Sequence, residues 1–449
     1  MESSARLSTP LQPTALQRGS PGFWRSLILA ALSLLSLGLL STPAQAVPAF
    51  ARQTGQACIA CHVGGFGPQL TPFGRAFKLG GYTLTDGKSG HIPLSAMLVS
   101  SYTHTTEDQT PFYNGMHGND NFVALQQASI FLAGRLTDHI GMMGQATYSE
   151  TAEPANLGWD NTDIRFAHDY TIGNTSGIFG VSVNNNPTVS DVWNTVPAWQ
   201  YGFMTSPISG GVPFAPLMAS LGGSVLGTTA YTLIDNHWYV EGGVYHGLSQ
   251  KWSDLLHAGA WGVTGYAPYF RANYSTTVGS STYEGGVLGM SMKPVSVTAG
   301  APATDSVKDV GVDGTYQYID GDNHSVTVNG LYMQEKASYD QSAGVFPGDT
   351  ARTLNLNAAY WIHNTYGATI QYFNVNGTSA ENGALTPGSN VQSNGVVWEL
   401  DWNPFGQSWA NPEKNLRLGL QYTTYNKLNG TSQGASGNNS LFLYMWLAI

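Results

Sequence analysis

Both cysteines of the chain fall in one short segment, Cys58-Ile59-Ala60-Cys61-His62. Two thiols three positions apart can each add to one vinyl group of a haem, and a histidine directly after the second thiol is then placed as an axial ligand of the iron. A thioredoxin-like dithiol needs a surrounding βαβ pattern, and a structural zinc site needs two more ligands; the sequence has neither. A disulfide is the remaining alternative. We therefore expect one covalent c-type haem, attached through Cys58 and Cys61, with His62 as proximal ligand.

The second axial ligand is specified less tightly. Methionine and histidine are both common opposite a haem histidine. The candidates near the motif in the sequence are His91, Met97, His104, Met116 and His117. Segment 93–105 is predicted to be a strand in which Met97 points inward with Ser95 and Thr103. Met97 is our first candidate for the distal ligand and His91 the second. The alternatives are that Met97 only packs the interior, or that the haem has no protein ligand on that side.

The first 46 residues have the pattern of an export signal. Arg18 and Arg25 supply positive charge, residues 27–40 form an apolar core, and Ala44-Gln45-Ala46 is a small-residue cleavage site. A membrane anchor is the alternative, but the apolar core is shorter than the roughly 20 residues of a spanning helix and is followed at once by the cleavage site. The stretch before the core is long, so a start codon further downstream also fits the pattern.

The composition lies between that of a cytosolic enzyme and that of a helical membrane protein. Charged residues make up 10% of the chain and aromatic residues 12%, whereas soluble proteins average about 25% charged residues. The net charge of −10 becomes −12 without residues 1–46, because three arginines and one glutamate leave 15 basic and 27 acidic residues. No basic patch exists, which excludes nucleic acid as a partner. A transmembrane β-barrel fits, since only alternate residues of its strands face lipid.

The remaining chain divides at about residue 92. Residues 47–92 are too few to bury a core of their own, so we expect a monohaem segment that docks inside a larger structure. Residues 93–449 alternate in period two: Trp398 and Leu400, for example, flank Glu399. One face of each segment is apolar and aromatic and the other is polar or small, as in strands with a lipid-facing outer surface.

About sixteen alternating segments can be counted in residues 93–449. They are centred near residues 99, 129, 145, 165, 181, 229, 242, 266, 287, 315, 330, 357, 370, 397, 420 and 444. Sixteen strands enclose a lumen wide enough for a channel or a plug. Short turns such as 137–138 alternate with longer links such as 187–217, which we expect to be external loops. We predict an all-β, antiparallel transmembrane β-barrel whose lumen is plugged by the haem segment. A soluble β-sandwich or propeller would need polar outer faces.

Residues 48–55 (PAFARQTG), the haem motif and residues 70–82 (LTPFGRAFKLGGY) resemble the outer-membrane cytochrome–porin fusion family. Its best-known members are the ferrous-iron oxidases of iron-oxidising bacteria. Over the barrel the resemblance rests on architecture and on the apolar last strand, which resembles an outer-membrane assembly signal but ends in Ile449 instead of the usual Phe. The resemblance carries over Cys58, Cys61 and His62 as haem residues. It implies one-electron transfer across the outer membrane, from an external donor to a periplasmic cytochrome or other acceptor. No substrate residue carries over.

The leading hypothesis is outer-membrane electron transfer, with extracellular Fe(II) as donor. Lumen carboxylates such as Glu399, Asp401 and Asp169 could attract Fe(II), because hard oxygen ligands suit such ions; alternatively they are ordinary polar lumen residues, partly paired with Arg165 and Arg417. A different donor or acceptor is a second possibility. The competing hypotheses are a diffusion porin whose haem is structural or regulatory, and a soluble periplasmic cytochrome enzyme.

A fractionation experiment separates the membrane hypotheses from the soluble one. We expect the exported protein to remain with the outer membrane in high salt and to dissolve only when detergent replaces the lipid around its apolar strands. A periplasmic protein extracted in parallel is the control. Release by salt alone would contradict the barrel and favour the soluble cytochrome.

Overall fold

The structure is a computed structural model. The chain divides into residues 1–45 and a compact unit of residues 46–449, and only the second unit is described below. The residues described are 49–449 except 66, 112, 114, 153–154, 194–203, 210–211, 213–214, 259–262, 295–303, 322, 340–348, 378–389 and 406–414. The predicted signal peptide therefore lies outside the described residues. Among the described helices, none combines the length and apolarity needed to cross a membrane.

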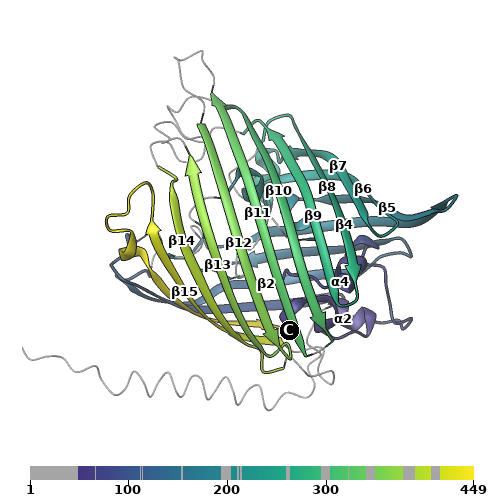
Figure 1. Cartoon of the computed structure of the whole chain (residues 1–449), viewed down its shortest axis with the longest axis horizontal. Helices are drawn as coiled ribbons and strands as arrows, with labels where there is room; N and C mark the ends of the chain where they lie inside the picture. Colours follow the sequence, from purple (N-terminus) through teal and green to yellow (C-terminus); the bar gives the residue numbers. More distant parts are fainter. Residues whose placement is uncertain are drawn as a thin grey trace, which may run out of the picture. The chain divides into compact units, whose positions relative to one another are not determined.

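Sixteen antiparallel strands form one closed barrel in which each strand pairs with its neighbours along the chain (Figure 1). The strands are β1 (Leu94–Thr105), β2 (Asp120–Arg135), β3 (Ile140–Tyr148), β4 (Leu157–Ile172), β5 (Thr175–Asn184), β6 (Val225–Ile234), β7 (Trp238–Gly247), β8 (Tyr266–Val278), β9 (Ser281–Met292), β10 (Thr304–Asp320), β11 (His324–Tyr339), β12 (Asp349–Ile362), β13 (Tyr366–Gly377), β14 (Ser393–Trp402), β15 (Asn415–Lys427) and β16 (Ser440–Ala448). The predicted all-β barrel of about sixteen strands is confirmed.

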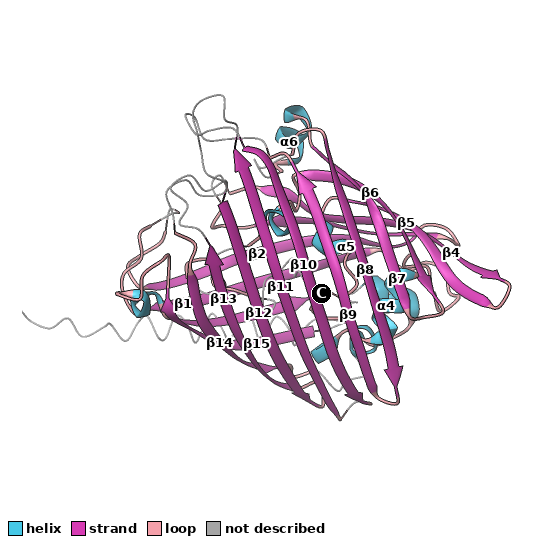
Figure 2. Cartoon of the chain, turned by 45° about the horizontal axis from the view of Figure 1, so that its top comes forward, coloured by secondary structure: helices cyan, strands magenta, loops and turns pink. Residues whose placement is uncertain are grey.

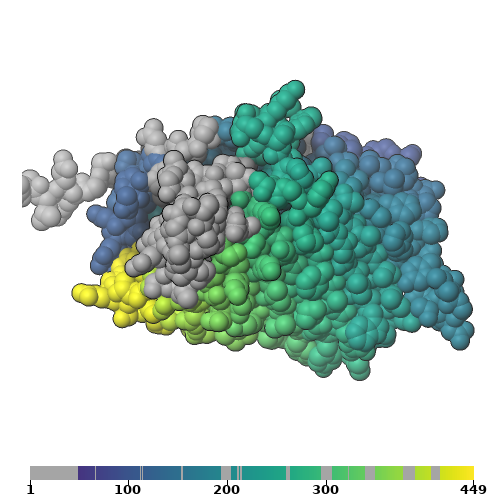
Figure 3. All heavy atoms as spheres, turned by 90° about the horizontal axis from the view of Figure 1, so that it is seen from above, coloured from purple at the N-terminus to yellow at the C-terminus, as the bar shows by residue number. Residues whose placement is uncertain are grey.

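The first and last strands close the ring. β1 pairs with β16 from Met97 opposite Ala448 to Thr105 opposite Ser440. In the view from above, the blue N-terminal strands adjoin the yellow C-terminal ones (Figure 3). Closure leaves neither strand with an unpaired edge, which a β-structure in lipid requires because hydrocarbon offers no hydrogen-bond partner.

The alternation seen in the sequence separates the two faces of the wall. On β14, Trp398 and Leu400 are 52% and 58% exposed, whereas Glu399 and Asp401 between and beside them are 3% and 5% exposed. The outward face is therefore apolar and aromatic, which suits lipid, and the inward face is polar.

The turn between β6 and β7 shows how the hairpins close: Asp235 and Asn236 both adopt positive φ, a conformation that these residue types tolerate best among non-glycines.

Polar groups on the inward face pair with one another. Three arginines of the wall, Arg165, Arg271 and Arg417, are at most 1% exposed. Each has a carboxylate partner: Arg165 bonds Asp163 at 2.7 Å, and Arg271 bonds Asp313 at 2.6 Å. Arg417 lies 3.9 Å from a carboxylate oxygen of Asp401, as predicted. Such pairing offsets the cost of removing these charges from water.

The described helices are few and short, and Figure 2 shows them against a molecule that is mostly strand. They are α2 (Ala49–Thr54), α3 (Cys58–Cys61), η1 (Val63–Gly65), α4 (Pro72–Leu79), α5 (Pro187–Ser190), η2 (Leu217–Ser220), α6 (Gln250–Leu256) and η4 (Ala435–Asn438). The first four precede β1 and contact the inner wall on opposite sides. Tyr82 donates to Asp163 of β4 at 2.7 Å, and Gly64 packs against Trp361 of β12, eight strands away in the ring.

The link 187–217, predicted to be an external loop, is partly internal, and the prediction is wrong at both of its ends. α5 is buried throughout, and η2 begins at Leu217, which is 1% exposed. Two wall carboxylates hold η2: Glu335 accepts from the backbone N–H of Leu217 at 2.6 Å, and Asp309 accepts from that of Met218 at 2.9 Å. These bonds form between positions distant in sequence, so local patterning could not indicate them.

A charge on the outer belt should destabilise the barrel. Leu420 is 39% exposed and lies between Leu400 and Leu443 of the neighbouring strands. We expect Leu420→Arg to lower the free energy of unfolding in vesicles by about 2–4 kcal/mol, the cost of a cation near the bilayer midplane. The measurement is the shift of the urea midpoint. Thr431→Arg, in the exposed turn that follows β15, is the control; an equal shift in both variants would contradict a lipid-facing Leu420.

Candidate haem site in the barrel lumen

The cysteine–histidine motif forms one helical turn followed by a tight loop. α3 spans the two cysteines, and the backbone N–H of His62 donates to the carbonyl of Cys58 at 2.8 Å. His62 then leaves the helix with extended φ and ψ and makes a short antiparallel bridge with Leu70. The i, i+3 spacing places both thiols on the same side of the turn, with the imidazole directly after it.

The next helix fixes the position of this turn. Thr71 caps α4 by accepting from the N–H of Gly74 at 3.1 Å, and Pro72 occupies the first turn, where the missing N–H costs nothing. The N–H of Thr71 also donates to the carbonyl of Cys61 at 2.9 Å. A Cβ on Gly74 would lie 2.2 Å from that same carbonyl, so only glycine allows α4 to pack this closely on the motif.

A cavity of about 280 Å³ opens beside the motif and is lined by both Cys61 and His62. This volume is near the lower end of the range for small-molecule sites, roughly 300–1,000 Å³. Most of the lining is apolar or aromatic. It includes Phe50, Phe77, Tyr82, Phe131, Met143 and Trp446. Phe50 stacks on Tyr82 with ring centroids 5.1 Å apart, so α2 and the segment after α4 form one aromatic wall of the cavity.

Met97 is placed in this cavity. It is 3% exposed and points inward from β1, as predicted, and it lines the same space as Cys61 and His62. Cys58 is not among the lining residues; it is buried at the edge of the site and hydrogen bonds to the side chain of Asn415 on β15. The structure thus brings Cys61, His62 and Met97 together in one cavity, whereas Cys58 does not line it.

The other candidates for the distal ligand lie elsewhere. His91 bonds the carboxylate of Asp86 at 2.9 Å and lines a different cavity of about 450 Å³. His104 bonds Asp120 at 2.8 Å at an exposed position. Met116 packs among buried residues after β1, and His117 is exposed. Of the five candidates, Met97 is the one among the described residues that lines this cavity of His62.

Burial changes the protonation of the motif in the haem-free chain. Desolvation raises the pKa of Cys58 to about 12 and that of Cys61 to about 11. Desolvation also lowers the pKa of His62 to about 4, partly offset by the backbone of Gly67. The imidazole is therefore neutral at physiological pH, which is the form that binds a metal. The thiols are protonated, and protonated thiols are poor nucleophiles.

The residues present fit a c-type haem. The Nδ1 atom of His62 is buried and makes no hydrogen bond of ordinary geometry within the described part of the chain. Its imidazole lines the cavity together with one motif thiol and the thioether of Met97, and these are the donor types that haem iron and its vinyl groups take. The aromatic and aliphatic walls suit a porphyrin face.

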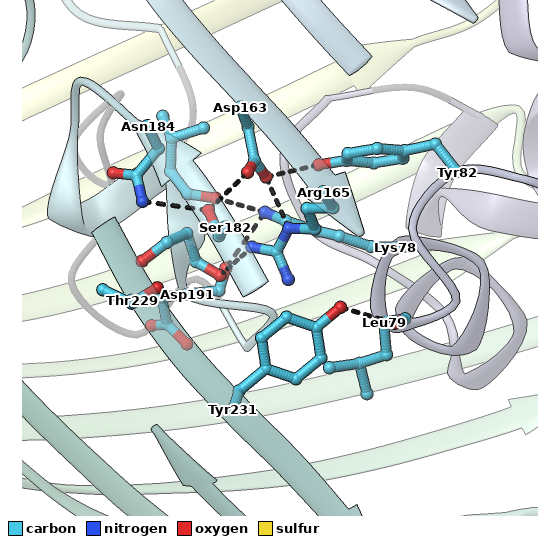
Figure 4. Close-up of polar contacts among 12 residues, drawn as sticks. Lys78, Leu79, Tyr82, Asp163, Arg165, Ser182, Asn184, Asp191, Thr229 and Tyr231 are labelled. Atoms are coloured by element: carbon cyan, nitrogen blue, oxygen red, sulfur yellow. Dashed lines mark hydrogen bonds and ion pairs between the residues drawn. The ribbon is translucent and has the colours of Figure 1, made fainter. Parts of the chain in front are cut away.

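A polar network that sequence reasoning missed holds the motif segment in place (Figure 4). Asp163 accepts from Tyr82, Arg165 and Ser182 at 2.7–2.8 Å, all in the buried interior. Tyr231 of β6 donates to the carbonyl of Leu79 at 2.6 Å. No sequence motif indicates this network, because its members lie on several strands and on the N-terminal segment and meet only after the barrel closes. The only signal was the inward parity of Asp163 and Arg165 on β4.

The lumen carboxylates proposed as Fe(II) ligands are mostly occupied by protein donors. Glu399 accepts from Gln421 at 2.6 Å, and Asp401 accepts from Tyr444 at 2.8 Å. Asp169 is exposed near the end of β4, and Arg165 pairs with Asp163 instead. Among the described residues no cluster of three or more metal-binding side chains occurs. The reading of Glu399 and Asp401 as ordinary polar lumen residues is the one that their contacts favour.

Fold and site together define a class: a sixteen-stranded antiparallel β-barrel of porin type, with a cysteine–histidine segment held against the inner wall. No protein-family model matches the chain, and no curated protein does. Among solved structures, the outer-membrane channel DcaP of Acinetobacter baumannii is similar with 12% identity and a TM-score of 0.45, over 79% of this chain and 96% of that one. OmpF of Salmonella typhi in complex with daunomycin has 13% identity and a TM-score of 0.45, over 79% and 97%. An anion-selective porin from Comamonas acidovorans has 10% identity and a TM-score of 0.45, over 79% and 98%.

The raised thiol pKa values predict slow alkylation of the folded, haem-free protein. At neutral pH we expect Cys58 and Cys61 to react with iodoacetamide about two orders of magnitude more slowly than free cysteine, because little thiolate is present. The rate should rise with pH towards about 11, where Cys61 deprotonates. Mass spectrometry measures the reaction, and the urea-unfolded chain is the control. Rapid labelling of the folded barrel at neutral pH would contradict the buried placement.

Proposed function

We propose that the protein is an outer-membrane electron-transfer protein that carries one c-type haem in its barrel and accepts electrons from extracellular Fe(II). One observation carries the proposal: Cys61, His62 and the candidate ligand Met97 line the same apolar cavity in the lumen of a closed barrel. Bound there, a c-type haem supplies one-electron redox chemistry. The resemblance of residues 48–82 to the cytochrome–porin fusion family supports the same assignment.

The chain's own residues have separate tasks in this proposal. Cys58 and Cys61 would tether the group by thioether bonds, and His62 and the candidate Met97 would bind its iron. The aromatic wall of Phe50, Phe77 and Tyr82 keeps water from the site. Ligation, burial and hydrogen bonding are the means by which a protein sets a haem potential; here His62 and Met97 would supply the ligands, and the cavity wall would supply the burial.

The position of the segment along the barrel fits a partner on the periplasmic side. The side-chain oxygen of Gln53 on α2 accepts from the N–H of Arg135 at 2.7 Å, at the end of β2 where a short turn leads to β3. Arg52 donates to the carbonyl of Leu94 at 2.5 Å, at the start of β1. Short turns face the periplasm in outer-membrane barrels. This position supports the part of the proposal in which a periplasmic cytochrome or similar acceptor takes up the electron at this end, while the donor would approach through the opposite end.

Stopped-flow reduction tests the electron-transfer function. The oxidised, haem-loaded protein in detergent is mixed with Fe(II) without oxygen, at acid and at neutral pH, and the haem absorption bands are followed. We expect conversion to the reduced spectrum. The double variant Cys58→Ser/Cys61→Ser, which lacks both tethers, should show no covalent haem on a denaturing gel and no such change. An oxidised spectrum that persists with Fe(II) at both pH values would contradict Fe(II) as the donor. If another donor then reduced the haem, the electron-transfer function would still hold without Fe(II) as its substrate.

A diffusion porin is the second candidate, and the sixteen-stranded barrel favours it because such barrels can enclose an aqueous channel. Conductance in planar bilayers separates the two functions. A porin predicts steady solute conductance that is the same for oxidised and reduced protein. The electron-transfer proposal predicts low conductance, because the N-terminal segment contacts opposite walls of the lumen.

A further inference from the structure

The cavity beside the motif has two side chains of formal charge in its lining, Lys78 and Asp191. The Asp191 carboxylate already has partners. One of its oxygens lies 3.3 Å from Nε of Arg271 and accepts from the N–H of Trp193 at 2.9 Å. Asp191 is 5% exposed. Lys78 is therefore the one cationic side chain among the described residues that line this cavity.

Lys78 has no acidic partner within ion-pair distance among the described residues. Its Nζ donates to the backbone carbonyl of Val189 and, at 3.4 Å, to that of Asp191. Figure 4 labels Lys78 and Asp191. The nearby carboxylate of Asp163 accepts three other hydrogen bonds, from Tyr82, Arg165 and Ser182. Neutral carbonyl oxygens compensate a buried ammonium only in part, and a buried charge is stabilised best by an opposite charge.

A second cation of α4 is directed elsewhere. Arg75 donates to the carbonyl of Leu70 at 2.8 Å and to the side chain of Gln317 at 3.2 Å. Its guanidinium lies 3.8 Å from the ring centroid of Trp193. Arg75 does not line the cavity. The two cations of α4 therefore have different surroundings. Arg75 holds α4 against the wall, and Lys78 faces the cavity next to Cys61 and His62.

A haem has two propionate carboxylates, which are anions at neutral pH. We propose that Lys78 is the residue that binds a haem propionate in this protein, an inference that rests on the proposed haem function. The ammonium keeps its two carbonyl acceptors and gains a direct ion pair, whereas the carboxylates of Asp163, Asp191 and Glu241 act on it only from beyond ion-pair distance. Lys78 is then a positioning residue that also acts on the redox equilibrium. Reduction adds one electron at the iron, and a cation that neutralises the propionate stabilises the reduced form relative to the oxidised form.

Potentiometric titration of the purified haem protein tests this role, and it needs no Fe(II). Lys78→Gln removes the charge but can still donate to the Val189 carbonyl, Lys78→Met is a second neutral variant, and Lys78→Arg retains the charge. Lys88→Gln is the matched control, because Lys88 belongs to the same segment but its side chain is 79% exposed. Heme staining and heat-modified gel mobility show that each variant carries haem and a folded barrel.

We expect the neutral variants to lower the midpoint potential, so that the reduced-to-oxidised ratio at a fixed potential falls about tenfold, which is ~59 mV for a one-electron couple. Their potential should also vary more steeply with pH near neutrality, because a buried propionate without its cation takes up a proton on reduction. Lys78→Arg and Lys88→Gln should keep the wild-type potential and its pH profile. A purely structural Lys78 would not produce this charge-specific difference.

Two results overturn the inference: neutral variants with the potential and pH profile of Lys88→Gln, or a Lys78→Arg potential that falls as far as that of Lys78→Gln. Should neither neutral variant fold, redox-difference infrared spectra of the wild-type protein with isotope-labelled propionates decide. Ionised propionate bands at neutral pH support the ion pair, and protonated bands contradict it. These outcomes are separate from the proposed function, which fails if the motif carries no haem or if the haem accepts no electrons from any donor.

Discussion

Every feature of the lumen depends on closure of the ring between β1 and β16. In hydrocarbon each backbone N–H and C=O must find a partner inside the protein, and only a ring of strands without edges provides one for every strand. Closure also decides which residues are interior. Met97 lies on β1 and Trp446 on β16, the two strands whose pairing closes the ring, and both residues line the cavity next to the motif. The candidate site is therefore built partly by the contact that completes the barrel.

The barrel interior contains buried charges, and its stability depends on their pairing as well as on packing. Arg165, Arg271 and Arg417 are removed from water, and each is matched by a carboxylate of the inner wall, on the same strand for Arg165 and on another strand for Arg271 and Arg417. The N-terminal segment uses the same network: Tyr82 joins Asp163, and the carbonyl of Gly64 accepts from Arg417 at 3.1 Å. A segment too short to form its own core is thus stabilised by hydrogen bonds to the polar inner wall of the barrel and by packing against its apolar surfaces.

This arrangement gives the motif a low-dielectric setting with few charges. Burial keeps His62 neutral and the thiols protonated in the haem-free chain. Since a protonated thiol reacts slowly, thioether formation is chemically easier while the chain is still open than after the barrel has folded around it.

The sequence by itself determined the parts that depend on local pattern. Period-two alternation indicated sixteen strands and their outward faces, because a strand between lipid and an aqueous or polar interior must alternate. The parity of β1 indicated an inward Met97, whereas the haem chemistry indicated by the Cys58 to His62 spacing stays a prediction. Tertiary structure alone decided what depends on contacts between distant segments. It folded the two ends of link 187–217 inward through bonds to Asp309 and Glu335. It also placed Met97, and not His91, in the cavity with His62, and turned Lys78 into the same space, because which inward residues meet is fixed only when the ring closes around the N-terminal segment.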